Sequence, residues 1–273
     1  MVPGCREWQP GDFVEAKTMF NGFPKDAISF LTELRLNNRQ DFYQANLERY
    51  EQVLKQPLRA LCEETEPVVH LIDPRLDTRP GSVMSRLRRD TRFTKDKSPF
   101  RDHVWLGWRY PGERRSEGFH MYWGFGPDWF GWGCGSYGPD KPLMDALRQT
   151  IRRDPDAVRN TLAPLLNAGY RVSGESFRRM SIPEEVPEDL KGLYAMKYFA
   201  AEADAAPRDW DCLFSHEAAE QLTCELERMA PILQLMSSLR GVQAEEPEAA
   251  QAVKPEAPAP IVRAVRSAEE FEF

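Results

Sequence analysis

The chain has 273 residues, of which 41% are hydrophobic and 29% are charged, and its formal net charge at pH 7 is −7. This length and composition suit one or two folded domains, and there is no apolar run of about 18 residues that would span a membrane. The negative charge provides no overall attraction to nucleic acid or anionic lipid, so such contacts would need a local basic patch.

Cysteine and histidine usage points away from disulfides and metals. The five cysteines are scattered and none forms a CxxC pair, so we expect reduced thiols rather than a disulfide framework or a zinc ribbon. The four histidines lack the spacing of metal ligands, and we predict no metal site and no cofactor. The first 20 residues lack the basic-then-apolar order of a secretory signal, and the expected location is the cytoplasm.

The N-terminal part of the chain carries two helical patterns. Apolar residues recur at helical spacing from Lys25 to Leu36, behind Pro24, and predict a helix that stops at Asn37. A second pattern runs from about Phe42 to Glu63, and Pro57 must kink or divide it.

Polar residues beside these patterns need a specific partner, because asparagine is costly in a helix unless it caps or bonds a defined group. We therefore expect Asn37 or Asn38 to cap the second helix. We also expect Arg39 or Asn46 to lie close to the basic segment described below.

The rest of the chain predicts strands followed by helices. Residues 82–137 are rich in aromatic residues and turn-forming glycines, which predicts antiparallel strands and hairpins. Two helices are expected between Leu143 and Leu166, broken at Asp154-Pro155. Short strands are expected in 170–180 and 193–200, and a closing helix in 215–239 that is interrupted near Pro231. The fold class is α+β: a central antiparallel sheet rich in aromatics, with helices from both ends of the chain packed on it.

Composition changes near Gly241. Residues 243–260 consist mainly of Ala, Glu, Pro and Gln, which bury too little apolar area to offset the entropy of ordering. We divide the chain into an N-terminal extension (1–20), a single α+β domain (21–240), a disordered linker (241–260) and a short C-terminal peptide (261–273). That peptide, with Phe271 and Phe273 among acidic residues, is a candidate docking motif for a protein partner.

One segment departs from the acidic character of the chain. Residues 86–101 contain seven basic residues and two aspartates. Guanidinium groups on one face of a strand repel one another unless an anion or a carboxylate lies between them. Asp90 is a candidate internal partner for one arginine, and a bound phosphate or carboxylate would serve others. The candidate ligand-binding residues are Arg86, Arg89, Asp90, Arg92 and Lys97. The other interpretation is a hairpin that is solvated or held by internal salt bridges.

The basic segment resembles the signature of a widespread bacterial family, the domain of unknown function 2461. The matching positions are Arg86, Arg89, Asp90, Arg92, Phe93, Lys97, Pro99 and Phe100, where the family usually has Pro-Tyr at the last two. The resemblance extends from about Phe20 to Leu239. It also covers Asn37-Asn38-Arg39, Asn46, the glycine-rich stretch at 131–135, and Lys197. Because the family has no assigned function, the resemblance implies no catalytic role. Asn38, Arg39, Asn46, His120 and Lys197 are candidate supporting residues.

Five of the seven tryptophans lie between Trp105 and Trp132. Aromatic residues at this density favour a sheet core, although beside basic residues one or two rings could line a ligand pocket. His120, within this segment, and His103 are candidate acids or bases if they face the same cleft, and structural histidines otherwise. The nearby glycines match no phosphate-binding loop.

These observations support three hypotheses. The first is a site for a small molecule bearing a phosphate or carboxylate, gripped by the basic segment and with an enzymatic step left open. The alternative is a non-enzymatic interaction protein in which the same charges are structural and the C-terminal peptide recruits a partner. Nucleic-acid binding is disfavoured because no basic stripe extends beyond this segment.

Overall fold

The structure is a computed structural model that describes residues 19–92, 94–113, 118–205 and 207–241. Five strands form one antiparallel sheet in the order β1-β2-β3-β5-β4. They are β1 (Val104–Trp108), β2 (His120–Gly126), β3 (Trp129–Gly135), β4 (Arg171–Ser176) and β5 (Met196–Asp204). The predicted α+β fold with a central aromatic sheet is confirmed. The predicted C-terminal linker and peptide lie outside the described residues, apart from Gly241, and so do residues 1–18 of the predicted extension.

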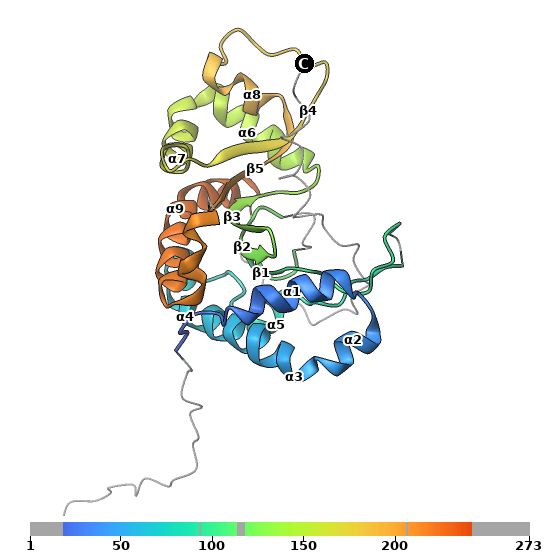
Figure 1. The fold of residues 1–273 in the computed structure, drawn as a ribbon. Coiled ribbons are helices and arrows are strands. Elements are labelled where there is room, and N and C mark those ends of the chain that lie inside the picture. Colours follow the sequence, from blue (N-terminus) through green and yellow to red (C-terminus); the bar gives the residue numbers. More distant parts are fainter. Residues whose placement is uncertain (1–18, 93, 114–117, 206, 242–273) are drawn as a thin grey trace, which may run out of the picture.

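The N-terminal helices lie together at one end of the sheet (Figure 1). They are α1 (Asp26–Leu36), α2 (Gln40–Ala45), α3 (Leu47–Tyr50), the π-helical turn η1 (Glu51–Lys55), α4 (Gln56–Ile72) and the short α5 (Pro80–Val83). The predicted division at Pro57 takes the form of this π turn. Proline has no N–H to donate to the carbonyl of Val53, and the wider turn directly before it absorbs the mismatch.

The later helices follow the local signals in the sequence. Helices α6 (Lys141–Arg153) and α7 (Pro155–Asn167) are separated at Asp154, whose side chain caps α7 by accepting from the Ala157 N–H. After them come η2 (Glu188–Leu190), α8 (Lys191–Tyr194), η3 (Pro207–Phe214) and α9 (Glu217–Leu239). The predicted interruption of the last helix is wrong. Helix α9 continues through Pro231 because Met229 and Ile232, on either side, are fully buried in the core.

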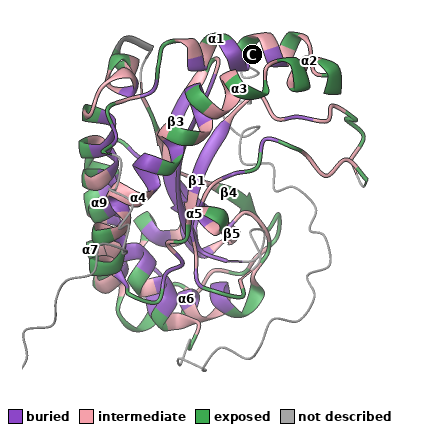
Figure 2. Ribbon diagram, turned by 90° about the horizontal axis from the view of Figure 1, so that it is seen from below, coloured by how far each residue is buried: buried purple, intermediate pink, exposed green. Residues whose placement is uncertain are grey.

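The central strands of the sheet are almost entirely buried (Figure 2). Their side chains contribute to one large hydrophobic cluster and one small one. One face packs on the helices, as shown by Trp123, whose Nε1 donates to Gln221 of α9 at 3.0 Å. The large core extends from Phe20 to Met236 and therefore begins inside the predicted N-terminal extension. Alternate residues on the other face, which we call the second face, form a separate cluster of Trp105, Tyr122 and Tyr137.

Candidate functional site

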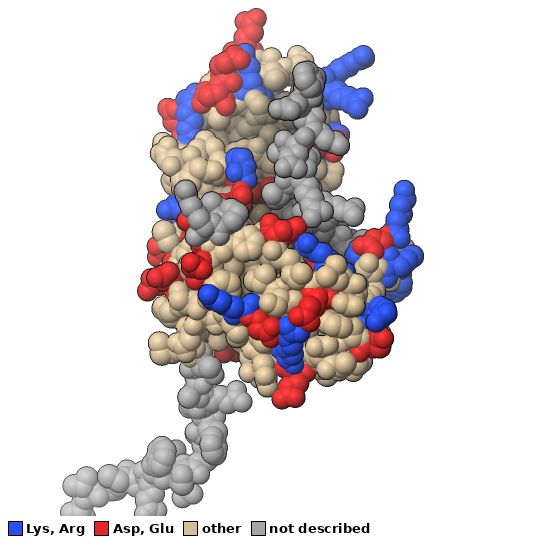
Figure 3. Space-filling view, viewed as in Figure 1, with Lys and Arg blue, Asp and Glu red and all other residues tan. Residues whose placement is uncertain are grey.

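Residues 86–101 form an arm that projects from the body, which we call the basic hairpin (Figure 1). Its two sides are joined by backbone hydrogen bonds from Arg89 N–H to the Pro99 carbonyl and from Arg101 N–H to the Leu87 carbonyl, both 2.8 Å. Leu87 and Phe100 are buried, which anchors the base of the arm. Basic side chains gather at this arm (Figure 3).

Several of the predicted ligand-binding residues are paired within the basic hairpin. Asp90 accepts from Arg92 at 2.7 Å, and this guanidinium lowers the pKa of the Asp90 carboxyl to about 2. Arg89 forms an ion pair with Asp96, and Lys97 donates to the Thr91 carbonyl at 2.9 Å. The expected role of Asp90 as an internal partner is therefore confirmed.

Arg86 and Arg88 differ from these paired residues. Both are exposed, and neither forms an ion pair with any residue that the structure describes. Their side chains point to solvent because Leu87, between them, is buried in the core. Of the five predicted ligand-binding residues, Arg86 and Lys97 thus carry exposed charges that meet no carboxylate among the described residues.

Asn38 fastens the N-terminal helices to the base of the basic hairpin. Its Nδ2 donates to the Phe100 carbonyl and its Oδ1 accepts from the Phe100 N–H, each at 2.9 Å. The ring of Tyr43 on α2 stacks on Phe100, with centroids 4.4 Å apart. Segments far apart in the sequence are therefore held side by side here.

The predicted cap on the second helix is wrong. Helix α2 begins after Arg39, without a side-chain cap. Asn37 instead ends α1, and the Asn38 side chain hydrogen-bonds to Phe100 rather than to the start of α2. Arg39 pairs with Asp41 at 3.3 Å, and Asn46 donates to the Phe42 carbonyl of its own helix. Asn38 thus bonds the basic hairpin directly, and the expected closeness of Arg39 or Asn46 to it stays a prediction.

Three basic side chains lie where the basic hairpin meets the second face, and we call Arg89, Arg101 and His103 the cation cluster. The Arg101 guanidinium lies over the Trp105 ring, 5.1 Å from its centroid, and Nη1 donates to the carbonyls of Arg86 and Arg88 at 2.9 Å. Burial, and then the charge of Arg89, lower the pKa of Arg101 to about 10. Arg101 therefore remains cationic at neutral pH in a place that disfavours its charge.

His103 occupies the same corner. Its ring stacks on Trp105 at 5.4 Å, and its Nδ1 lies 2.9 Å from an oxygen of Asp102, which also accepts from Arg35. Burial lowers the pKa of His103, while the Asp102 carboxylate opposes that shift. Asp102 therefore orients the imidazole and leaves its Nε2 as the atom that can exchange a proton.

The second face continues from Trp105 across the sheet to Glu202 on β5. The hydroxyls of Tyr122 and Tyr137 donate to Oε1 of Glu202 at 3.0 and 3.2 Å, and Ser173 donates to Oε2 at 2.7 Å. His120, also on this face, is buried with its Nδ1 3.2 Å from the Gly118 carbonyl. The second face thus carries both aromatic and polar side chains.

Two glycines allow neighbouring strands and their aromatic residues to pack closely. A Cβ at Gly124 would lie 2.6 Å from the Val104 carbonyl oxygen and 2.7 Å from the Cβ of Trp105, and one at Gly133 would lie 2.6 Å from the Ala201 carbonyl oxygen and 3.0 Å from the Tyr122 ring. Any larger residue at these positions would clash with the adjacent strand. The glycine-rich strands therefore serve close packing on the second face rather than a phosphate loop.

Lys197 does not join this group. It pairs with Glu175 on the neighbouring strand β4 and lies over the Phe177 ring at 5.6 Å. None of its described partners belongs to the basic hairpin or the cation cluster.

Sequence reasoning left four residues out of the candidate ligand-binding and supporting set: Arg101, His103, Trp105 and Glu202. The first three alternate in an extended segment, and this spacing of two was a signal that they share one side. Glu202 carried no such signal, because only the pairing of β5 beside β3 brings it to Tyr122.

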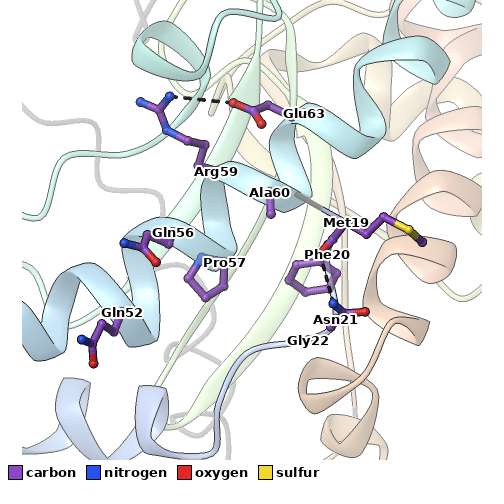
Figure 4. A pocket seen from close by; sticks show the side chains of 10 residues that line it. All are labelled: Met19, Phe20, Asn21, Gly22, Gln52, Gln56, Pro57, Arg59, Ala60 and Glu63. Carbon is purple, nitrogen blue, oxygen red and sulfur yellow. Dashed lines mark hydrogen bonds and ion pairs between the residues drawn. The ribbon is translucent and has the colours of Figure 1, made fainter. Parts of the chain in front are cut away.

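A separate hollow of about 310 Å³ lies between α4 and the segment before α1 (Figure 4). Phe20, Pro57 and Ala60 line it with apolar surface. The cation among its lining residues, Arg59, is 3.8 Å from Glu63. This hollow therefore suits an anionic ligand less well than the cation cluster does.

The described residues hold no group of three or more His, Cys, Asp or Glu side chains placed to bind a metal ion. Within the same ranges, no helix has both the length and the apolar character needed to cross a bilayer.

The fold and site define an α+β protein whose antiparallel sheet is covered by helices on one face and presents aromatic and polar side chains on the other. Residues 26–234 match the model of a family described as conserved hypothetical protein (DUF2461), and the chain belongs to this family. No curated protein and no solved structure matches the chain.

Proposed function

We propose that this protein binds a small molecule that carries a phosphate or a carboxylate, and that the cation cluster receives the anionic group. The observation that supports this most directly is the half-buried Arg101. Among the described residues it contacts no carboxylate, and its Nη1 donates only to the carbonyls of Arg86 and Arg88. A half-buried guanidinium without a counterion is unfavourable, and an anion would relieve it.

The geometry of Arg101 suits bidentate binding. A guanidinium has five N–H donors, and the two on Nη1 are engaged with backbone carbonyls. The donors on Nε and Nη2 remain for a ligand, and this fork matches the spacing of two oxygens in a carboxylate or phosphate. Arg89, although paired with Asp96, adds positive charge beside it. The site thus combines directional donors with a favourable field.

An enzymatic step at this site would use His103. Its Nδ1 is held by Asp102, so Nε2 would give or take a proton from a ligand bound at Arg101. Binding alone requires only the arginines. Enzyme activity therefore needs a separate test, in which the His103→Gln variant retains binding and loses turnover.

The binding test is a melting screen of the full chain with inorganic phosphate, sugar phosphates, nucleotides and carboxylic acids. A ligand present at about 100 times its dissociation constant stabilises the folded state by roughly 2.7 kcal/mol, which a melting curve resolves. We expect Arg101→Met to abolish the shift. The matched control is Arg153→Met on α6, an exposed arginine, which should retain it. A shift that survives in Arg101→Met, or no shift with any anion, would contradict the proposal.

A specific observation favours the alternative, a non-enzymatic interaction protein. Arg89 and Arg92 are both paired with aspartates, and Asn38 locks the basic hairpin to the helices. Under this alternative, Arg89→Ala would destabilise the ligand-free protein, and no small anion would change its melting temperature. The partner-recruiting role suggested for residues 261–273 and the cytoplasmic location both stay predictions.

A further inference from the structure

Strand β4 forms one edge of the sheet (Figure 1). Among the described strands it pairs with β5 alone, and none of its six residues is buried. The opposite edge, β1, is covered, because the Ser85 N–H donates to the Trp105 carbonyl at 2.8 Å and Met84 forms a β-bridge with Leu106. An edge strand leaves the N–H and C=O groups of alternate residues without a partner strand. Strand β4 is therefore a place where an extended peptide can add to the sheet.

The chain directly after β4 combines exposed cations with apolar surface. Among the large apolar side chains that the described chain exposes, Phe177 is the only aromatic one, with 42% of its surface exposed. Arg178 and Arg179, which follow it, are exposed and form no ion pair with any carboxylate that the structure describes. Met180, next along, is half-buried against the core. We call β4 and these four residues the edge patch.

The C-terminal peptide, residues 261–273, has a composition that suits the edge patch. Its first half includes the β-branched residues Ile261, Val262 and Val265, which favour an extended strand. Its second half combines three glutamates with two phenylalanines: Glu269, Glu270, Phe271, Glu272 and Phe273. Acidic side chains next to aromatic ones are complementary to a surface that carries arginines beside apolar groups.

The order of charges indicates the direction in which the peptide would lie. Along the edge patch, one acidic residue is followed three and four positions later by two basic ones: Glu175, Arg178 and Arg179. The peptide has the same spacing with each sign reversed: Arg266, Glu269 and Glu270. Glu175 keeps 55% of its side chain exposed, although it also pairs with Lys197. A peptide that runs parallel to the edge patch therefore brings opposite charges together, whereas an antiparallel one in the same register brings like charges together.

The chain between α9 and this peptide is long enough to reach the edge patch. Arg240, directly after α9, forms an ion pair with Asp140, which caps α6. Arg148 lies eight residues further along α6, a rise of about 12 Å, and its guanidinium is 5.6 Å from the centroid of the Phe177 ring. The path from the end of α9 to the edge patch is thus on the order of 30 Å. Residues 242–260 span up to roughly 60 Å when extended.

We propose that residues 261–273 bind the edge patch of their own chain, as an added strand along β4 with the glutamates at Arg178 and Arg179. A tethered peptide meets its site at an effective concentration on the order of 1 mM, so a dissociation constant of about 0.1 mM keeps it bound roughly nine-tenths of the time. The basic hairpin is less suitable for this peptide, because Leu87 and Phe100 are buried and not available to its phenylalanines. This inference is independent of the proposed function.

Hydrogen exchange of the full chain, measured by mass spectrometry, tests the inference. We expect the amides of residues 261–273 to exchange about fivefold or more slowly in the native protein than in Arg178→Glu/Arg179→Glu, whose reversed charges repel the glutamates of the peptide. The amides of β4 should lose protection in the same variant. Adding Glu269→Arg/Glu270→Arg to it should restore the slow exchange of both segments, because the charges are again opposite.

The matched control is Arg86→Glu/Arg88→Glu on the basic hairpin. These two arginines are also exposed and also form no ion pair with a described residue. Reversing them changes the net charge of the protein by the same amount as the reversal at the edge patch. We expect this control to leave the exchange of residues 261–273 as slow as in the native protein.

Three results would overturn the inference. If residues 261–273 exchange equally fast in the native protein and in Arg178→Glu/Arg179→Glu, the peptide does not bind the edge patch. If only the control accelerates their exchange, the peptide binds the basic hairpin instead. If their protection increases with protein concentration, the peptide binds a second copy of the chain rather than its own.

Discussion

Asn38 offers the sharpest test of how the basic hairpin is held. Its amide satisfies both the N–H and the carbonyl of Phe100, a residue with 2% of its surface exposed. Asn38→Ala removes both partners and leaves two backbone groups without their hydrogen bonds. Each buried orphan costs about 1–3 kcal/mol, so for the two groups we expect the free energy of unfolding to fall by about 2–6 kcal/mol.

Unfolding in guanidinium chloride, followed by tryptophan fluorescence, measures this loss of unfolding free energy. Asn38→Asp retains the acceptor for the Phe100 N–H and removes the donor to the carbonyl, so its loss should be smaller than that of Asn38→Ala. The control is Asn160→Ala at an exposed position on α7, where we expect a change within about 0.5 kcal/mol. If Asn38→Ala also stays within that limit, the two hydrogen bonds do not hold the basic hairpin and the reasoning is refuted.

Two further predictions concern the second face and the ion pair of His216, directly before α9, with Glu64. The Glu64 carboxylate, 2.5 Å from His216, raises the pKa of that imidazole above its ordinary 6.5. The stabilisation that protonated His216 gains from Glu64 is fully present below pH 6.5 and is lost as the pH rises through the raised pKa. The free energy of unfolding of the native protein should therefore decrease over that pH range, and in His216→Gln this decrease should be smaller. Gly124→Ala places a Cβ 2.7 Å from that of Trp105, so we expect the free energy of unfolding to fall by about 1–3 kcal/mol and the near-ultraviolet circular dichroism to change. The control is Gly81→Ala, whose added Cβ meets no atom within 4 Å and should leave the free energy of unfolding unchanged.

The helices could be predicted from the sequence because their signals are local. The apolar spacing of α1 and the break at Asp154-Pro155 act over one or two turns, and both occur where expected. Pro231 misled the same reasoning. A proline removes one hydrogen bond, and that local loss is outweighed when the flanking Met229 and Ile232 are fully buried.

The candidate site could be predicted only in part, because its contacts join distant segments. The basic character of residues 86–101 was visible, but whether each arginine meets a carboxylate depends on the path of the chain. Asn38 was expected to cap its own helix and instead binds Phe100, 62 positions away. Glu202 is 80 positions from Tyr122, and nothing in its neighbourhood marks it as a polar centre. The order of the strands in the sheet, which the sequence pattern does not specify, brings Glu202 and Tyr122 together.

The anchoring of Arg101 to the carbonyls of Arg86 and Arg88 couples occupancy of the site to local opening of the arm. When the two sides of the arm separate, the guanidinium loses both its supports and its orientation. A ligand that binds only the closed arm must then slow opening in proportion to its occupancy. The amide protons of Arg89 and Arg101, which cross between the two sides, should therefore exchange with solvent more slowly as ligand is added, and these two backbone positions report binding directly.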